Sequence, residues 1–373
     1  MGVWCSALGV VAAICCVAQL RAQQDGPAPE QPVFRAGVNF VRVDVIVTDR
    51  QGNPVTNLTR DDFEVLEDDR PQVIEQFRLV DATGTGRDDL PARELRTRDD
   101  ELFDAEREDV RVFALLLDDY HVPRTRSAAV RDTLVAFIRE HVRPNDLLTV
   151  AYPLTPVTTL TFTRDHESVM RAIRLFEGRK GEYTPRNAAE EQHWRNLPAI
   201  ERIRGDVVID ALSALSVRLG SLREGRKPII LVGDGFGASY VRLRDVHRDA
   251  NRNNVSIYPF DPCGLTATQG FAGNGRPDCS SSRQRRDTLL QLAEETDGRA
   301  IVNRNTLAAG LAQIARDSSY YYLLGYTSSQ PPGDGRFHPI RVRVKPRGLD
   351  VRARKGYWAP ALVLLLRLLQ GLA

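Results

Sequence analysis

Apolar and polar positions follow two different patterns along the chain, and the change between them divides the sequence into regions. Residues 40–47 alternate between apolar and polar side chains, which is typical of a half-buried strand. Residues 113–117 are instead a continuous apolar run, Phe-Ala-Leu-Leu-Leu, and residues 229–232 form a second one. Such runs indicate strands buried on both faces of a parallel sheet. We therefore expect two kinds of sheet.

Strand and helix patterns take turns in the central region, 109–318. Helical periodicity predicts helices over 125–142, 166–176, 200–222, 241–251, 285–296 and 306–316. Strands are predicted over 110–117, 147–152, 157–162, 229–235, 255–260 and 300–303. Residues 178–196 are interpreted as a loop or a poorly anchored helix. The order predicts an α/β domain with a doubly wound, mostly parallel sheet.

Short strands occur at both ends of the chain. They are predicted over 63–68 and 72–77 near the start, and over 320–326, 340–345 and 350–354 near the end. The N-terminal unit, 33–82, and the C-terminal strands, 319–358, would each bury too little apolar surface alone. We therefore predict that they pair into one β-sandwich. Residues 83–108 are dense in charge and poor in apolar side chains, and are interpreted as a mobile charged linker.

The first 22 residues are apolar and rich in small side chains, which predicts a signal peptide cleaved after Ala22. A retained N-terminal anchor is the alternative. Two cysteines follow in the mature chain, Cys263 and Cys279, and in an exported protein they are expected to form a disulfide. The tail, 359–373, is apolar but too short to span a bilayer. The expected location is the periplasm, the cell envelope or the exterior.

Composition and motifs argue against several classes of function. The 373 residues carry a formal net charge of +2 with mixed signs, so no nucleic-acid partner is expected. The six histidines lack ligand spacing, and there is no His-Glu-x-x-His motif, nucleophile elbow or phosphate loop. A phosphatase of the haloacid dehalogenase type would need an aspartate where Tyr120 stands. Arg204-Gly205-Asp206 lies within a predicted helix, so a cell-attachment role is not expected.

Carboxylates stand where two buried strands end. Asp118 and Asp119 follow the first apolar run, and Asp234 follows the second within Gly-Asp-Gly. Ligand sites of open α/β sheets gather beyond the carboxyl ends of the strands. These aspartates are therefore the first candidates for a binding site.

The pattern resembles the von Willebrand factor type A family, and within it a branch of secreted proteins abundant in Acidobacteria. The residues that carry the resemblance are Leu-Asp-Asp-Tyr-His at 117–121, Asn-Asp-Leu at 145–147, Tyr-Tyr-Leu-Leu-Gly-Tyr at 321–326 and Val-Arg-Ala-Arg-Lys-Gly-Tyr at 351–357. A further mark is Asp-Arg-Gln-Gly-Asn-Pro-Val at 49–55. The similarity covers nearly the whole chain after the leader.

The resemblance implies a metal-ion-dependent adhesion site, normally Asp-x-Ser-x-Ser after the first strand plus a later threonine and aspartate. Asp118 and Asp234 match its aspartates and Thr184 is the candidate threonine, but Tyr120 and Val122 replace the serines. Mg²⁺ requires octahedral oxygen ligands, so we expect a degenerate site and no cofactor. Mg²⁺ or another divalent cation is the alternative, with Asp119 or His121 restoring a ligand. A structural alternative is that Asp118 caps a turn and pairs with Arg124 or Arg126.

These observations predict a non-enzymatic, exported protein-interaction module for adhesion or scaffolding. Tyr120 and His121 are expected on its binding surface, beside Asp118 and Asp234. A metal-dependent hydrolase using Asp118, Asp119 and Asp234 is one alternative, and a purely structural envelope protein is another. The expected partner is a protein. Membrane contact is expected only through an uncleaved leader or the apolar tail.

Overall fold

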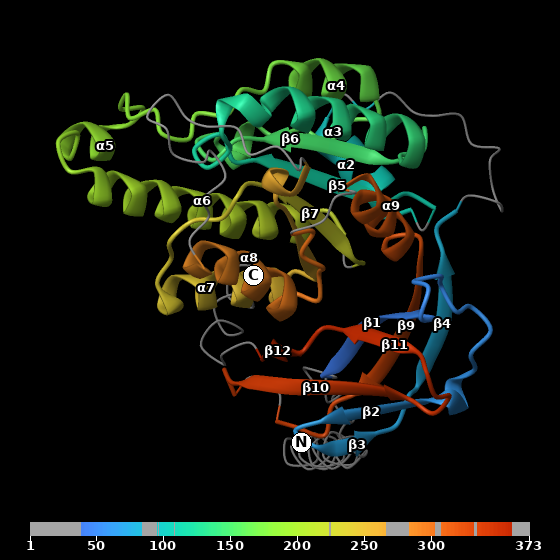
Figure 1. Cartoon of the computed structure of the whole chain (residues 1–373). Coiled ribbons are helices and arrows are strands. Elements are labelled where there is room, and N and C mark those ends of the chain that lie inside the picture. Colours follow the sequence, from blue (N-terminus) through green and yellow to red (C-terminus); the bar gives the residue numbers. More distant parts are fainter. Residues whose placement is uncertain are drawn as a thin grey trace, which may run out of the picture. The chain divides into compact units, whose positions relative to one another are not determined.

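The computed structural model describes residues 39–83, 95, 97–107, 109–223, 225–265, 283–302, 307–331 and 334–359 (Figure 1). All of these belong to one compact unit. The predicted leader, Cys279 and the tail from residue 360 lie outside the described residues. No helix in the described ranges is long and apolar enough to cross a membrane.

The predicted buried strands form a four-stranded parallel sheet. Its strands lie in the order β6-β5-β7-β8, and all neighbours pair in parallel. Their bounds are β5 Val112–Leu117, β6 Leu147–Ala151, β7 Lys227–Val232 and β8 Val255–Phe260. Every residue of β5, β7 and β8 is buried, which explains why the first two read as continuous apolar runs.

Helices cover both faces of this sheet (Figure 1). One face packs against α3 Ser127–His141, α4 His166–Arg174 and α9 Leu307–Asp317, and the other against α6 Leu197–Gly220, α7 Tyr240–Arg252 and α8 Arg283–Glu295. Side chains of β5 alternate between the two cores: Phe113 and Leu115 face the first group, Ala114 and Leu116 the second. The α/β prediction is confirmed at this level.

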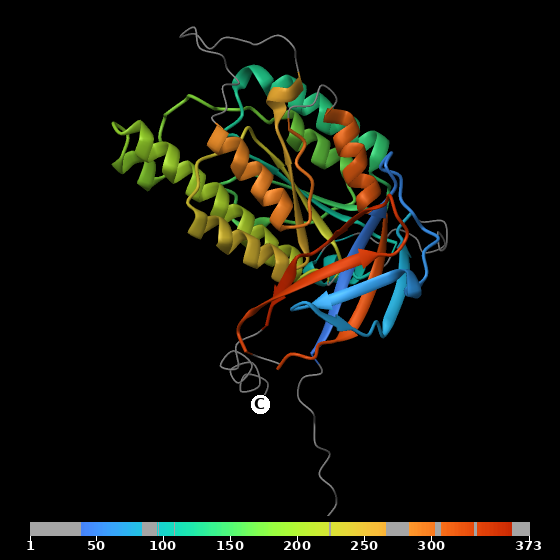
Figure 2. The same ribbon diagram turned by 60° about the horizontal axis from the view of Figure 1, so that its bottom comes forward.

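Strands from both ends of the chain build two antiparallel sheets, as predicted (Figure 2). One sheet has the order β11-β1-β9-β4 and the other β12-β10-β2-β3. Their bounds are β1 Phe40–Thr48, β2 Phe63–Glu67, β3 Arg70–Gln72, β4 Gln76–Asp81, β9 Tyr320–Thr327, β10 Phe337–Val344, β11 Asp350–Ala353 and β12 Gly356–Trp358. Val43 in β1 lies opposite Leu324 in β9, and both are fully buried in the core that the two sheets share.

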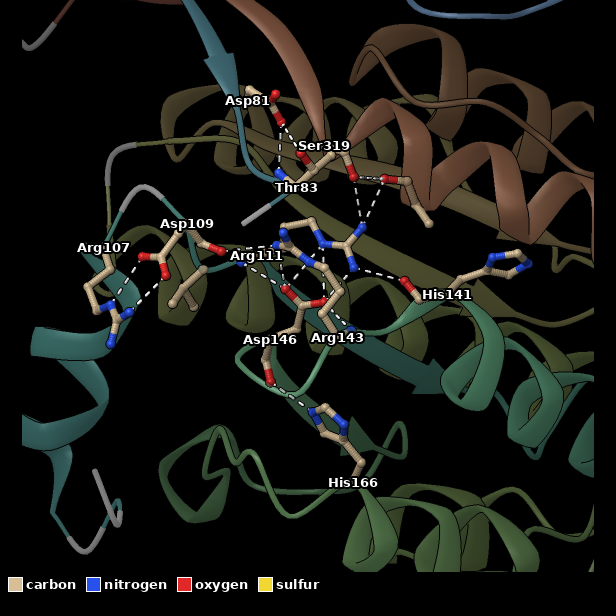
Figure 3. Close-up of polar contacts among 12 residues, drawn as sticks. Asp81, Thr83, Arg107, Asp109, Arg111, His141, Arg143, Asp146, His166 and Ser319 are labelled. Carbon is tan, nitrogen blue, oxygen red and sulfur yellow. Dashed lines mark hydrogen bonds and ion pairs between the residues drawn. The ribbon is translucent and has the colours of Figure 1, made fainter. Parts of the chain in front are cut away.

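A buried ion pair joins the amino ends of β5 and β6 (Figure 3). Arg111 donates to both carboxylate oxygens of Asp146, at 2.5 Å for the shortest contact, and both side chains are buried. The same guanidinium donates to Ser319, which precedes β9 (2.8 Å). Arg111 therefore links the parallel sheet to the strand that returns to the sandwich.

Several predicted elements differ from the structure. Residues 157–162, predicted as a strand, contain the 3₁₀ turn η3 Val157–Thr159, because Pro156 starts a turn and only Thr163 bridges to Leu148. The predicted strand 72–77 is the end of β3 and the start of β4, and 300–303 contributes a single bridge at Ile301. The remaining short elements are η1 Arg60–Asp62, η2 Arg124–Arg126, α5 Ala188–Gln192 and η4 Pro262–Leu265.

The charged region 83–108 contains a helix, α2 Arg98–Ala105, where we predicted a mobile linker. Two of its buried acidic residues form ion pairs: Glu101 with Arg218, and Asp104 with Arg164 at 2.8 Å. The charges that suggested a solvated linker are therefore contacts to the α/β domain.

Candidate functional site

The carboxyl ends of three neighbouring strands bring three aspartates to one edge of the parallel sheet. Asp118 follows β5, Asp234 follows β7 by one glycine, and Asp261 follows β8. All three are almost completely buried. Asp261 was not singled out from the sequence, although a strand that ends in aspartate was the signal used for the other two. Burial raises its pKa to about 6, while the bonded amide of Cys263 opposes the shift.

The chain supplies a cationic partner for Asp118 from the same loop. His121 Nδ1 lies 2.7 Å from Asp118 Oδ2, and both side chains are buried. Burial alone would lower the pKa of His121, but the charges of Asp118 and Asp234 and the hydrogen bond outweigh it and raise the pKa. His121 therefore keeps its proton to a higher pH than a free histidine does. Arg124, one of the two arginines considered as a partner of Asp118, instead contacts Glu177 at 2.7 Å.

A second loop, residues 178–186, covers this edge and carries two more cations. Lys180 Nζ is paired with Asp234 Oδ2, and Arg186 Nη1 lies 2.5 Å from Asp119 Oδ2. Burial raises the pKa of Asp234 and of Asp119, while the paired cation opposes the shift in each case. Lys180 and Arg186 were missed from the sequence, where only Thr184 of this loop was considered.

Backbone contacts fix this loop onto the one after β5. The amide of Arg179 donates to Asp119 O (2.7 Å), and that of Lys180 donates to Val122 O (3.1 Å). Gly178 permits the approach, because a Cβ at this position would lie 2.3 Å from Val122 O. The cations are therefore held in place by main-chain bonds.

Tyr120 and Val122, which stand where the resemblance implies serines, are both buried. Val122 belongs to the apolar core beneath α3 and α4. The Tyr120 ring contacts the guanidinium of Arg204, whose carbon lies 4.7 Å from the ring centre, and Arg204 is itself paired with buried Glu190 at 3.2 Å. Arg204 and its neighbour Gly205 are thus packing residues inside α6, not an exposed attachment tripeptide.

The expected binding surface must be corrected. Tyr120 and His121 are each 1% exposed, so neither offers contact area to a partner. Thr184, the candidate metal-binding threonine, is exposed, whereas Asp118 and Asp234 are buried. The structure brings the two aspartates to one edge of the sheet but leaves Thr184 on the outer side of the covering loop.

The donor set does not fit a magnesium ion. Among the described residues, Asp118, Asp119, His121 and Asp234 do not form a cluster in which three ligand atoms lie within 4.8 Å of one another. The hydroxyl positions are filled by Tyr120 and Val122, and each aspartate contacts a side-chain cation. Asp118 Oδ1 and Asp234 Oδ1 have no hydrogen-bond partner among the described residues, but a hard divalent ion at these oxygens would still lack the hydroxyl ligands.

A cavity of about 950 Å³ lies away from this edge. It is lined by the ends of α6 and α7 and by sandwich strands, and its charged residues are mainly arginines: Arg42, Arg78, Arg223, Arg252 and Arg354, with Asp44 and Glu106. None of the aspartates discussed above lines it. The cavity is therefore distinct from the candidate site.

Neither a protein-family model nor a curated protein matches this chain.

Proposed function

We propose that the chain is a non-enzymatic protein-binding module of the type A kind, exported to the envelope or the exterior. One observation carries the proposal: each aspartate of the loops after β5 and β7 is neutralised by a cation of the chain itself, namely His121, Arg186 or Lys180. Buried, paired carboxylates are poorly placed to act on a substrate. The strand order and the helices on both faces support the likeness to type A domains.

Exposed apolar side chains at and just before the beginnings of α6 and α7 provide the contact area. Trp194, in the connection between α5 and α6, is 55% exposed, and Leu197, the first residue of α6, is 46% exposed. Tyr240 and Val241, at the start of α7, are also exposed. We call these four residues the apical face. Aromatic side chains are enriched in protein interfaces and often supply most of the binding energy.

The neutralised aspartates serve this face as a rigid support. Arg186 and Lys180 hold the loop from which the chain continues into α5 and then α6 (Figure 1). In this reading the role that a metal has in adhesion sites is taken by side-chain cations, and partner binding needs no divalent ion. This distinguishes the proposal from the metal-dependent hydrolase.

Photo-crosslinking in envelope extracts of the native host tests the proposal. A photoreactive residue at Tyr240 should give the same crosslinked partner with and without chelator, and Trp194→Ala with Leu197→Ala should abolish the product. Val217→Ala is the matched control, because Val217 is 54% exposed on the same helix, roughly 30 Å away at 1.5 Å per residue. Crosslinking that survives the double substitution, or that disappears with chelator, would contradict the proposal.

A further inference from the structure

A second cluster of ionisable residues lies in the β-sandwich, far along the chain from the aspartates discussed above. Glu67 ends β2, Asp68 begins the tight turn to β3, and His338 is the second residue of β10. The amide of Asp68 donates to Pro339 O (3.0 Å), which fixes the turn against β10. Asp68 and Asp69 have φ of 49° and 60°, as a two-residue hairpin of this kind requires.

Two of these residues occupy positions where the sandwich needs apolar side chains. Glu67 continues the inward-facing row of Phe63 and Val65, and His338 continues that of Ile340. Glu67 is 0% exposed and His338 is 4% exposed. Burying a carboxylate is costly unless its oxygens find partners. Their presence here calls for a compensating interaction.

Protein groups satisfy only part of this requirement. Glu67 Oε1 accepts from Tyr357 Oη (2.6 Å) and Ser328 Oγ (2.8 Å). Glu67 Oε2 is buried and makes no hydrogen bond of normal geometry among the described residues, although the buried hydroxyl of Tyr326 interacts with this carboxylate. Two hydroxyl groups thus orient the Glu67 carboxylate through Oε1, while Oε2 could bind an ion. Carboxylates that bind metals are commonly oriented in this way by hydrogen bonds from neighbouring residues.

The ligand atoms of the three residues are already gathered. One atom each of Glu67, Asp68 and His338 lies within 4.8 Å of the other two, and no other such group occurs in the described ranges. His338 Nδ1 is 2.8 Å from Asp68 Oδ2, and its Nε2 is 3.2 Å from Asp334 Oδ1. Two ligands of one tetrahedral zinc ion lie about 3.3 Å apart, given bonds of about 2 Å. The contact between His338 and Asp68 would lengthen by roughly half an ångström, and the atom of Glu67, which lies within 4.8 Å of the other two, would move closer by at most roughly 1.5 Å.

We propose that Glu67, Asp68 and His338 bind a divalent transition-metal ion, with Asp334 as the hydrogen-bond partner that orients the imidazole from its other ring nitrogen. One imidazole with carboxylates is a donor set that suits Zn²⁺ better than Ca²⁺, which prefers oxygen alone. The ion would replace a proton of His338, which is released to solvent. It would tie the β2–β3 turn to β10 and so stabilise the sandwich. This inference is independent of the proposed function.

Calorimetry with ZnCl₂ on the untagged protein tests the site. We expect one ion per chain with a dissociation constant tighter than roughly 10 µM, and a higher melting temperature in its presence. His338→Asn and Asp68→Asn should each weaken binding at least about tenfold. His193→Asn, on the loop after α5, should leave it unchanged. Binding should tighten from pH 6 to pH 8, because the ion competes with a proton.

Other outcomes would overturn the proposal. These are affinity weaker than about 1 mM, equal affinity in His338→Asn and the unaltered chain, or Ca²⁺ binding as tightly as Zn²⁺. Asp68→Asn keeps the experiment decisive if His338→Asn does not fold, because Asp68 lies in the turn and its side chain is 30% exposed.

Discussion

Replacing Lys180 by methionine should destabilise the protein strongly, although this side chain lies in a surface loop. Asp234 is fully buried, and Lys180 is paired with it. Breaking a buried ion pair by removing one partner typically costs about 3–5 kcal/mol. His121 also favours the charged form of Asp234, so we expect about 3 kcal/mol, the lower end of this range.

The loss of stability in Lys180→Met should depend on pH, and the pKa of Asp234 determines the direction of this dependence. Burial already raises the pKa of Asp234, and without Lys180 it rises further. A carboxyl group whose pKa is higher in the folded than in the unfolded protein favours folding at low pH, and this contribution is lost as the pH rises through the folded pKa. The stability deficit of Lys180→Met should therefore be small at pH 5 and larger at pH 8.

Urea unfolding at both pH values, followed by circular dichroism, measures the effect. Lys355→Met is the control: Lys355 contacts Glu294 and Glu295 at 3.3 and 3.0 Å but is 41% exposed, so its loss should cost less than about 1 kcal/mol. Adding Asp234→Asn to Lys180→Met should restore part of the stability. Equal deficits for the two lysine variants, or a Lys180→Met deficit that does not change with pH, would refute the argument.

Three further predictions concern the same edge and the covalent structure. The pKa of His121 is raised in the folded protein, so its stabilising contribution is complete below about pH 6.5 and is lost as the pH rises through the folded pKa. The free energy of unfolding should therefore fall from about pH 6 to about pH 9, and this fall should be smaller in His121→Gln. Calorimetry should give a Mg²⁺ dissociation constant weaker than roughly 1 mM; a tighter one that Asp118→Ala abolishes would reverse the conclusion about the donor set. Mass analysis of protein isolated without reductant should find Cys263 bridged to Cys279, and two free thiols would contradict this.

The sequence predicts the frame better than it predicts the contacts made by loops. The apolar runs of β5 and β7 identify the parallel sheet, and its topology places Asp118 and Asp234 at one edge. The pattern of apolar and polar positions does not show which cations contact these aspartates. Lys180 comes from a loop whose path depends on the close approach of Gly178 to Val122.

The charged helix α2 was missed for a related reason. Its buried residues are Asp100, Glu101, Asp104 and Ala105, so no apolar stripe marks its inner face. Burial there depends on arginines such as Arg218, which is distant in the sequence and pairs with Glu101. A local pattern cannot distinguish such a helix from a solvated linker.

The pairing of β1 with β9 also constrains the order in which the chain can fold. Phe40 lies opposite Thr327, so the first described strand has no partner until almost the whole chain has been made. Contacts this distant in sequence form slowly, whereas the strands and helices of 109–318 are neighbours along the chain. We expect the parallel sheet to form first and the sandwich to close last. Until then the open edges of β1 and β4 are exposed to association with other chains, which makes this interval the time of greatest risk of aggregation.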